Sequence, residues 1–321
     1  MPQANESLNG IKWYNEGPWQ REVNSILEGL GEIGPAPAIF LNTENGDDDN
    51  DGLSWDTAKL TMSGALSAVE TGGTVYFTGD VREELTGDNL KFDISIVGVT
   101  NKPHHADLPA AGYKTGASAW RPPASPTAAT PLIKVRGRGW KFVNILFDCP
   151  VDAAAVYLER NALSDVSEYD ASHASFYGCR FDSGKVGIEN AGGASFVRVE
   201  GCQFYRLTES GGAGIKCTST SVAVPLNWQI INNHFANNAS HILSSMSYSE
   251  ISGNKFGRFT ATLSIDIDDQ PSANQGEYNI ITLNYLTGTY GATAFPPGSN
   301  NEWAGNINVG ITGAWTDADP A

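Results

Sequence analysis

Three alternate aspartates form the first group of residues whose spacing could do chemistry. Asp47, Asp49 and Asp51 come directly before Gly52, which fits the first half of a calcium-binding loop, because alternate carboxylates can converge where glycine lets the chain bend. The bidentate glutamate that such a loop carries at its twelfth position is absent, since that position is Ala58. Two interpretations remain, a loop that binds Ca²⁺ and a solvated turn, and no other cofactor is expected.

Other carboxylates could cut a polysaccharide. Glycoside hydrolysis needs two carboxylates that flank the scissile bond, about 5–5.5 Å apart for retention of configuration and about 6.5–9.5 Å apart for inversion. On a strand, Asp266 and Asp268 would share one face. All the candidates are Asp266, Asp268 and Asp269, together with Glu159, Glu168 and Asp170. There is no Gly-His-Gly element of the polygalacturonase type, so no catalytic residue is assigned and solvated carboxylates are the simpler interpretation.

Tryptophans could stack on sugar rings. Trp140 and Trp228 begin predicted strands, so we expect them to pack inside the protein. Trp120, in a proline-rich stretch, and Trp303, near the C-terminal end, are the better candidates for an exposed contact with a glycan. The five histidines show no metal-ligand spacing, and the sequence has no phosphate-binding loop, dinucleotide fingerprint or nucleophile elbow.

Charge and composition exclude several classes of protein. The formal net charge is −16, with 20 Lys and Arg against 36 Asp and Glu. A nucleic-acid partner is not expected, because phosphate backbones demand a basic surface. No run of about 18 apolar residues is present, so no membrane partner is expected, and no signal peptide is visible. Thirty-five glycines favour a β-rich chain with many turns.

The elements that would position these residues begin with an amphipathic segment at 1–38. Its apolar positions fall on one stripe of a helix that Pro18 opens and that Gly29 and Gly31 close. The stripe and its flanking tryptophans are Trp13, Trp19, Val23, Ile26, Leu27 and Leu30. A short lone helix is not stable in water. The segment is therefore either a cap on its own domain or an arm that anchors or oligomerises a rigid body.

Residues 39–321 are expected to form that body. Its start module, 39–80, contains a helix predicted from about Thr57 to Glu70 between two strands. Residues 100–131 carry six prolines and should form an excursion without a core of its own.

Residues 139–310 repeat at intervals of 21 to 34 residues, and a short strand recurs in each interval, which predicts stacked coils. One column of repeat positions would form an apolar spine: Phe147, Phe181, Phe204, Phe235, Phe256 and Leu286. Two residues earlier, a second column reads Ile145, Cys179, Cys202, Asn233, Asn254, Asn284 and Asn306. Stacked asparagines can hydrogen-bond along the axis as a ladder, and the cysteines would be buried thiols. We therefore favour an all-β chain, folded as a right-handed parallel β-helix with a short N-terminal helical arm or cap.

The sequence resembles a known family at residues 45–58 and 120–158. The first stretch contains Asn50-Asp51-Gly52-Leu53-Ser54-Trp55-Asp56-Thr57-Ala58, and the second contains Gly139-Trp140-Lys141-Phe142-Val143-Asn144-Ile145-Leu146-Phe147. Both are similar to pectate-lyase-superfamily β-helices, which are common among structural proteins of tailed bacteriophages. At the level of the fold, the resemblance covers roughly residues 39–310.

The resemblance implies a homotrimeric virion protein that is assembled in the host cytoplasm and exposed on the particle surface. Such a protein serves as capsid decoration (cement) or as a tailspike, joins other capsid or tail proteins through its N-terminal arm, and can adhere to a host surface glycan. The same fold also serves enzymes. The alternative is a depolymerase, either a glycan lyase or a glycoside hydrolase, that acts on host surface glycans. A third alternative is a glycan binder that does not cleave.

Overall fold

The computed structural model describes residues 38–87, 91–100, 118–160, 169–218, 224–258, 265–266, 276–288 and 300–309. The chain divides into two compact units, Met1–Pro35 and Ala36–Ala321, and every described residue belongs to the second unit. The predicted arm lies outside the described residues except for residue 38. This holds for Trp13, Trp19, Val23, Ile26, Leu27 and Leu30.

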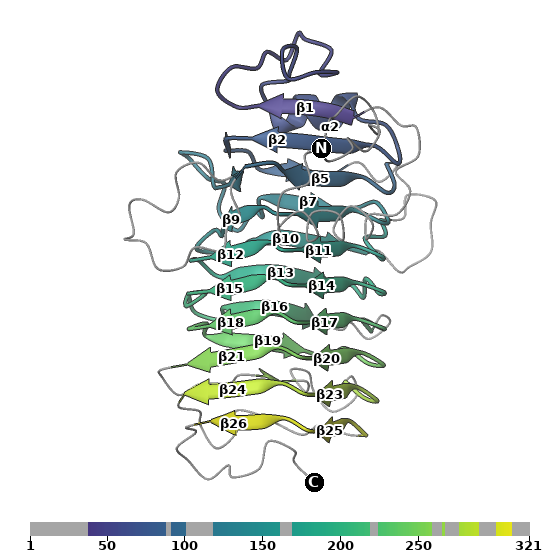
Figure 1. Cartoon of the computed structure of the whole chain (residues 1–321), viewed down its shortest axis with the longest axis vertical. Helices are drawn as coiled ribbons and strands as arrows, with labels where there is room; N and C mark the ends of the chain where they lie inside the picture. Colours follow the sequence, from purple (N-terminus) through teal and green to yellow (C-terminus); the bar gives the residue numbers. More distant parts are fainter. Residues whose placement is uncertain are drawn as a thin grey trace, which may run out of the picture. The chain divides into compact units, whose positions relative to one another are not determined.

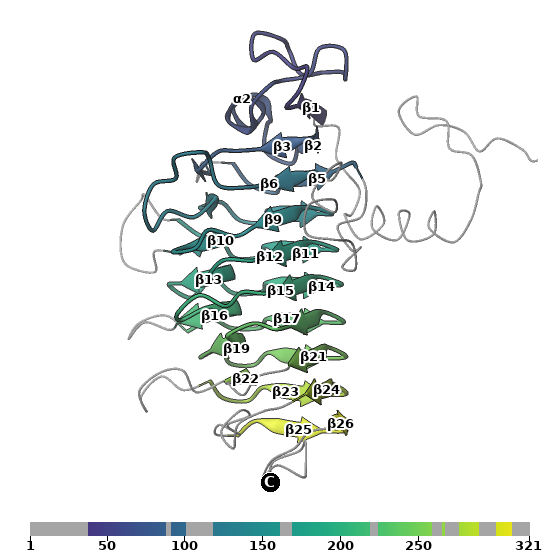
Figure 2. The ribbon, with the colours of Figure 1, turned by 90° about the vertical axis from the view of Figure 1, so that its left-hand side faces the viewer.

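Three sheets run along the second unit, and the chain passes through them in turn, as Figures 1 and 2 show. Sheet A contains β1 (Ala38–Asn42), β2 (Thr74–Thr78), β5 (Ser95–Gly98), β8 (Lys141–Val143), β11 (Ser175–Tyr177), β14 (Arg198–Glu200), β17 (Gln229–Ile231), β20 (Glu250–Ser252), β23 (Ile280–Thr282) and β25 (Glu302–Ala304). Sheet B contains β3 (Asp80–Val81), β6 (Ala119–Trp120), β9 (Leu146–Asp148), β12 (Arg180–Asp182), β15 (Gln203–Tyr205), β18 (His234–Ala236), β21 (Lys255–Arg258), β24 (Tyr285–Gly288) and β26 (Ile307–Val309). Sheet C contains β4 (Leu85–Thr86), β7 (Ile133–Val135), β10 (Ala154–Glu159), β13 (Val186–Ala191), β16 (Ala213–Thr218), β19 (Ser240–Ser244) and β22 (Ile265–Asp266).

Every pairing between these strands is parallel, and each strand pairs with the equivalent strand of a neighbouring coil, on both sides except at the ends of each sheet. A chain that returns to the same sheet in a parallel sense does so right-handedly in about 98% of cases, because a twisted strand packs back onto its sheet only in that way. The fold is a right-handed parallel β-helix, as the repeats predicted.

The turn between sheets A and B holds the predicted Asn column. Its first residue takes the left-handed conformation, with φ of 54° to 66°, at Asn144, Gly178, Gly201, Asn232, Gly253, Leu283 and Gly305. At its second residue, Nδ2 of Asn233 donates to Oδ1 of Asn254 at 3.0 Å, and Nδ2 of Asn254 donates to Oδ1 of Asn284 at 3.0 Å. Nδ2 of Asn284 donates to Oδ1 of Asn306 at 2.9 Å. Because each Oδ1 also accepts a backbone N–H of the preceding coil, this ladder ties both side chain and main chain along the axis.

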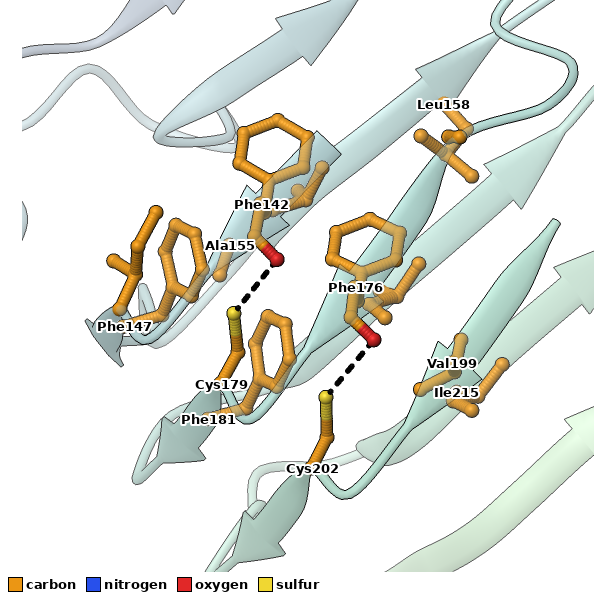
Figure 3. Packing of buried hydrophobic residues seen from close by; sticks show 14 of the residues in the cluster. Phe142, Phe147, Ala155, Leu158, Phe176, Cys179, Phe181, Val199, Cys202 and Ile215 are labelled. Atoms are coloured by element: carbon orange, nitrogen blue, oxygen red, sulfur yellow. Dashed lines mark hydrogen bonds between the residues drawn. The ribbon is translucent and has the colours of Figure 1, made fainter. Parts of the chain in front are cut away.

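In the earlier coils, cysteine occupies the position of the ladder asparagine and makes one of its hydrogen bonds. Sγ of Cys179 donates to the carbonyl of Phe142 at 3.4 Å, and Sγ of Cys202 donates to that of Phe176 at 3.5 Å (Figure 3). The Nδ2 of Asn233 uses the equivalent carbonyl, that of Val199. A thiol therefore replaces the donor of the amide.

Aromatic rings fill the coil beside the ladder (Figure 3). The rings of sheet B stack with centroids 4.6 to 5.0 Å apart, along Phe147, Phe181, Phe204, Phe235 and Phe256. A second stack joins Phe142 and Phe176 of sheet A, at 5.1 Å. All of these rings are buried, and Leu286 continues the sheet B column, as the predicted spine requires.

Helix α2 (Met62–Ala68) is shorter than predicted. The prediction placed its start near Thr57, but Lys59 instead pairs with the edge of β1, donating to Phe40 and accepting from Asn42 at 2.9 Å. Because Lys59 is hydrogen-bonded to the edge of β1, it cannot take a helical conformation. The helix therefore begins only after Thr61, whose Oγ1 accepts the N–H of Gly64. Met62, Ala65 and Val69 are buried in the hydrophobic core.

Two tryptophans predicted as exposed contacts lie in the core. Trp120 is fully buried in β6, where its ring packs on Phe147 at 6.1 Å, and Trp303 is 8% exposed in β25. The prediction for both was wrong, because each side chain takes the inward position of a strand. The interior placement predicted for Trp140 and Trp228 is confirmed, since both are buried.

Candidate functional site

Charged and aromatic side chains line the outer face of sheet C over β7, β10, β13 and β16. Alternation along these strands sends apolar side chains inward and the others outward. The pairing register puts Lys134, Tyr157, Glu189 and Lys216 side by side across four coils. We define the charged face of sheet C as Lys134, Arg136, Arg138, Tyr157, Glu159, Arg160, Tyr169, Asp170, Glu189 and Lys216.

Glu159, one of the carboxylates nominated for catalysis, is held by two cations of this face. Nε of Arg136 donates to its Oε2 at 2.5 Å, and Nζ of Lys134 lies 4.0 Å from its Oε1. The guanidinium of Arg136 also lies over the ring of Tyr169, 3.9 Å from its centroid. The ion pairs of Glu159 cross from one coil to the next.

Asp170, the second nominated carboxylate in the described residues, is held in a similar way. Its Oδ2 lies 2.5 Å from Nη2 of Arg138, its Oδ1 lies 3.9 Å from Nε of Arg160, and Oδ1 accepts the N–H of Ser172. Burial by itself would raise the pKa of Asp170, but the hydrogen bonds from Ser172 and Arg138 and the charge of Arg138 lower that pKa below its ordinary value.

These pairings are those of structural carboxylates. A general acid in glycoside cleavage needs a raised carboxyl pKa, and the pKa of Asp170 is lowered. The pKa of the Tyr157 hydroxyl is raised by burial and then by the charges of Glu189 and Glu159, so this phenol stays protonated. The charged face can therefore hold hydrogen-bonding ligands and join coils, but Asp170 is a poor proton donor.

The remaining catalytic candidates have no described side chain. Asp266 belongs to β22, where its backbone pairs with Leu243, and nothing is described of its side chain. Asp268, Asp269 and Glu168 lie outside the described residues.

The acidic loop uses its carboxylates on its own backbone. Asp47 accepts the N–H of Asp49 at 3.0 Å. The pKa of Asp51 is lowered by hydrogen bonds from the N–H of Leu53 and from the hydroxyl of Thr57. Within the described ranges, no three His, Cys, Asp or Glu side chains gather closely enough to hold a metal ion. The structure thus does not bring Asp47, Asp49 and Asp51 together, and Ca²⁺ binding by this loop stays a prediction.

Sequence reasoning missed a buried ion-pair group on the outer face of sheet B. Asp182 is fully buried and receives Nη2 of Arg180 at 2.9 Å and Nη2 of Arg206 at 2.9 Å. Both guanidiniums lie 5.0 to 5.5 Å from the ring centre of Tyr205. The signal in the sequence was Arg-Phe-Asp around the spine residue Phe181, which places both charges on one outer face.

A second ladder was also missed. Nδ2 of Asn279 donates to Oδ1 of Asn301 at 2.9 Å, and Oδ1 of Asn279 accepts the N–H of Ser249 at 2.9 Å. This column stands five residues before the first ladder, as Asn279 before Asn284 and Asn301 before Asn306. That constant offset could have revealed it.

Within the described part of the chain, no helix has the length and apolarity that crossing a membrane requires. The three sheets, the two ladders and the ion-paired outer faces define the class of the molecule as a right-handed parallel β-helix protein.

No protein-family model matches the chain, and no curated protein matches it significantly. Solved structures similar to it include the GH136 lacto-N-biosidase from Eubacterium ramulus, at 11% identity and a TM-score of 0.49, over 90% of this chain and 57% of that one. They also include the pectate lyase Pel9A, at 14% identity and a TM-score of 0.46, over 89% of this chain and 80% of that one. The ORF18 protein of Geobacillus virus E2 is similar at 16% identity and a TM-score of 0.40, over 95% of this chain and 55% of that one. The chain thus spans a little over half the length of the first and third of these proteins, and at such identities the likeness concerns the fold alone.

Proposed function

We propose that this chain is a structural protein of a bacteriophage particle, a homotrimeric β-helix spike exposed on the virion surface as capsid decoration or tailspike. Its N-terminal segment attaches it to other virion proteins, and its coils form the projecting body. The sequence resemblance at 45–58 and 120–158 supports this assignment.

The observation that carries the proposal is how each described coil is fastened to the next. Two asparagine ladders and an aromatic stack join the coils from inside. Ion pairs such as Arg136 with Glu159 and Arg206 with Asp182 join them from outside. Glu159 and Asp170, the nominated carboxylates whose side chains are described, both take part in such pairs. Such an arrangement suits a stiff body better than a catalytic groove.

Exposed apolar side chains support the homotrimer. They lie at the corner between sheets A and B in the last coils, as Ile280, Leu283, Tyr285 and Ile307, with 39% to 70% of each exposed. Earlier coils carry polar or charged residues in the same register, for example Lys255 before Tyr285 and Glu250 before Ile280. Contact with further copies of the chain would remove this apolar surface from water.

Electron microscopy of labelled particles tests the assignment. Antibody against this chain should mark regular positions on the capsid or tail, and absence of the chain from purified particles would sink the proposal. Light scattering should give a species three times the 34.2 kDa chain mass. Ile307→Lys should reduce that species to single chains, whereas Leu53→Lys, an exposed leucine on the acidic loop, should not.

The enzymatic alternative has its own test. Its remaining candidates are Asp266, Asp268 and Asp269. Incubation of the purified chain with host polysaccharide should release no oligosaccharide, and release that is lost in Asp268→Asn would favour the depolymerase.

A further inference from the structure

Each coil enters sheet A through one residue in the left-handed conformation. These residues, with φ of 53° to 72°, are Asp93, Gly139, His173, Phe196, Asn227, Tyr248, Tyr278 and Asn300. From Asp93 to Tyr248, each N–H donates to a carbonyl of the next coil at 2.8 to 3.1 Å. The backbone of this turn is therefore the same whichever side chain it carries.

Three of these side chains are unsuited to that backbone. Glycine and asparagine tolerate the left-handed region, and they occupy Gly139, Asn227 and Asn300. For other L-residues the conformation costs roughly 1–2 kcal/mol each. Phe196, Tyr248 and Tyr278 carry this strain although the turn does not need them. Strain of this kind, where simpler residues would serve, marks functional positions.

The strained rings are also exposed. Phe196 is 53% exposed, Tyr248 is 58% exposed and Tyr278 is 50% exposed. The ring of Phe196 stacks on that of His173 with centroids 4.9 Å apart and planes 5° apart, and Tyr248 stacks on Tyr278 at 5.2 Å and 14°. We call these four residues the aromatic column. Because they contribute nothing to the buried core, neither packing nor turn geometry accounts for them.

The surface beside the aromatic column is polar and locally neutral from Ser175 to Glu250, and it becomes apolar at Ile280, which is 53% exposed beside Tyr278. Two residues after the column, the outward positions of sheet A read Ser175, Arg198, Gln229 and Glu250, in direct register. Nε of Arg198 donates to Oε2 of Glu200 at 2.9 Å, and its Nη1 donates to Oε1 of Gln229 at 3.2 Å. A protein interface would be depleted of charge at its centre. Flat rings beside hydrogen-bonding side chains instead match a sugar, which has apolar C–H faces and a rim of hydroxyls.

We infer that the aromatic column binds an uncharged polysaccharide laid along the coil axis. The two ring pairs are separated by the coil of Asn227, so Phe196 and Tyr248 stand two strand spacings apart, about 9.6 Å. Several linked sugar units span that interval and contact both pairs, while one sugar contacts only one. The net charge of −16 and the paired Arg198 argue against an acidic glycan. This surface belongs to the chain itself and does not depend on its location in a virion.

Titration calorimetry on the purified full chain tests the inference with cellohexaose, maltohexaose and chitohexaose, with polygalacturonate as the acidic comparison. At least one neutral hexasaccharide should bind, at least tenfold more tightly than its monosaccharide. Phe196→Asn and the double variant Tyr248→Asn with Tyr278→Asn should each weaken binding at least tenfold. Both should melt at or above the wild-type temperature, because asparagine relieves the backbone strain. Trp55→Ala, which removes an exposed ring from the acidic loop, should bind as the wild type does.

Three results would overturn the inference: no binding of any neutral hexasaccharide, binding that survives both Asn variants, and a change of oligomeric state in those variants. The last would assign the rings to a contact between copies. Particle labelling can fail while hexasaccharide binding succeeds, and the reverse also holds, so the spike and the binding surface are tested separately.

Discussion

Replacing Asn254 by alanine should remove a link from the first ladder and leave its neighbours without partners. Its Oδ1 accepts the N–H and Nδ2 of Asn233 at 2.9 and 3.0 Å. Its Nδ2 donates to the carbonyl of Ile230 at 2.8 Å and to Oδ1 of Asn284 at 3.0 Å. The side chain is fully buried, so no water can replace these four bonds without rearrangement.

The magnitude follows from those bonds. A buried hydrogen bond contributes about 1 kcal/mol net, and a buried amide left unsatisfied costs about 1–3 kcal/mol. Asn254→Ala should therefore lower the free energy of unfolding by about 4 kcal/mol, or the melting temperature by roughly 6 °C for a chain of 321 residues. Asn254→Cys should cost about 1 kcal/mol less, because a thiol can still donate to the Ile230 carbonyl, as Cys202 donates to that of Phe176.

Urea denaturation followed by circular dichroism measures both losses, with Ser252→Ala, a half-exposed change on the neighbouring strand, as the control. An unchanged slope against urea is required, because stacked coils can unfold in parts. Hydrogen exchange should accelerate at the amide of Asn233. A loss below about 1 kcal/mol for Asn254→Ala, or an amide of Asn233 that stays protected, would refute the ladder as a major source of stability.

In the single chains that Ile307→Lys should produce, Leu283→Asn should stabilise the fold by about 1 kcal/mol, because it replaces a leucine at φ 57° by a residue that tolerates this conformation. Thermal unfolding measures the gain at an oligomeric state checked by sedimentation, and a lower melting temperature would contradict the strain argument. The pKa of Asp170 is lowered in the folded chain, so its stabilisation is present above the unfolded value of 3.8 and is lost as pH falls through the folded value. The stability gap between wild type and Asp170→Asn should be full at pH 7 and should close below about pH 4; a gap independent of pH would exclude an ionic origin. The four buried thiols should react with a thiol reagent only on unfolding, and burial, followed by the neighbouring Cys179, raises the pKa of Cys202 and slows it further; complete labelling of the native chain within minutes would contradict their placement.

The sequence revealed the interior where one residue type recurs in one column. Phe204 belongs to a column of phenylalanines, and Asn254 belongs to a column of asparagines. Although the coils differ in length, the same residue type recurs in each column, and this recurrence revealed the repeat. The second ladder escaped notice because its column changes type, from Trp228 through Ser249 to Asn279. A side chain's role in such a column depends on which residue the next coil places beside it.

The start of helix α2 and the proline-rich stretch 100–131 show where local sequence patterns fail to predict the structure. The helix predicted from Thr57 rested on a regular spacing of apolar residues. In the structure, Lys59 instead forms backbone hydrogen bonds with the edge of β1. Trp120 lies in a stretch whose prolines suggest a surface loop. Its strand nevertheless enters sheet B between β3 and β9, and that pairing joins segments about 25 to 40 residues apart.

The sequence alone determined the parallel coil, its aromatic spine and its Asn column, because periodicity and turn chemistry are local properties that repeat. Only the tertiary structure decided which charges meet. Glu159 finds Arg136 at a separation of 23 residues, and Asp182 finds Arg206 at 24. It also decided that Phe196 stacks on His173 in solvent. Loops of unequal length lie between these partners, so their pairing follows from strand register, which long-range hydrogen bonding sets and local sequence does not.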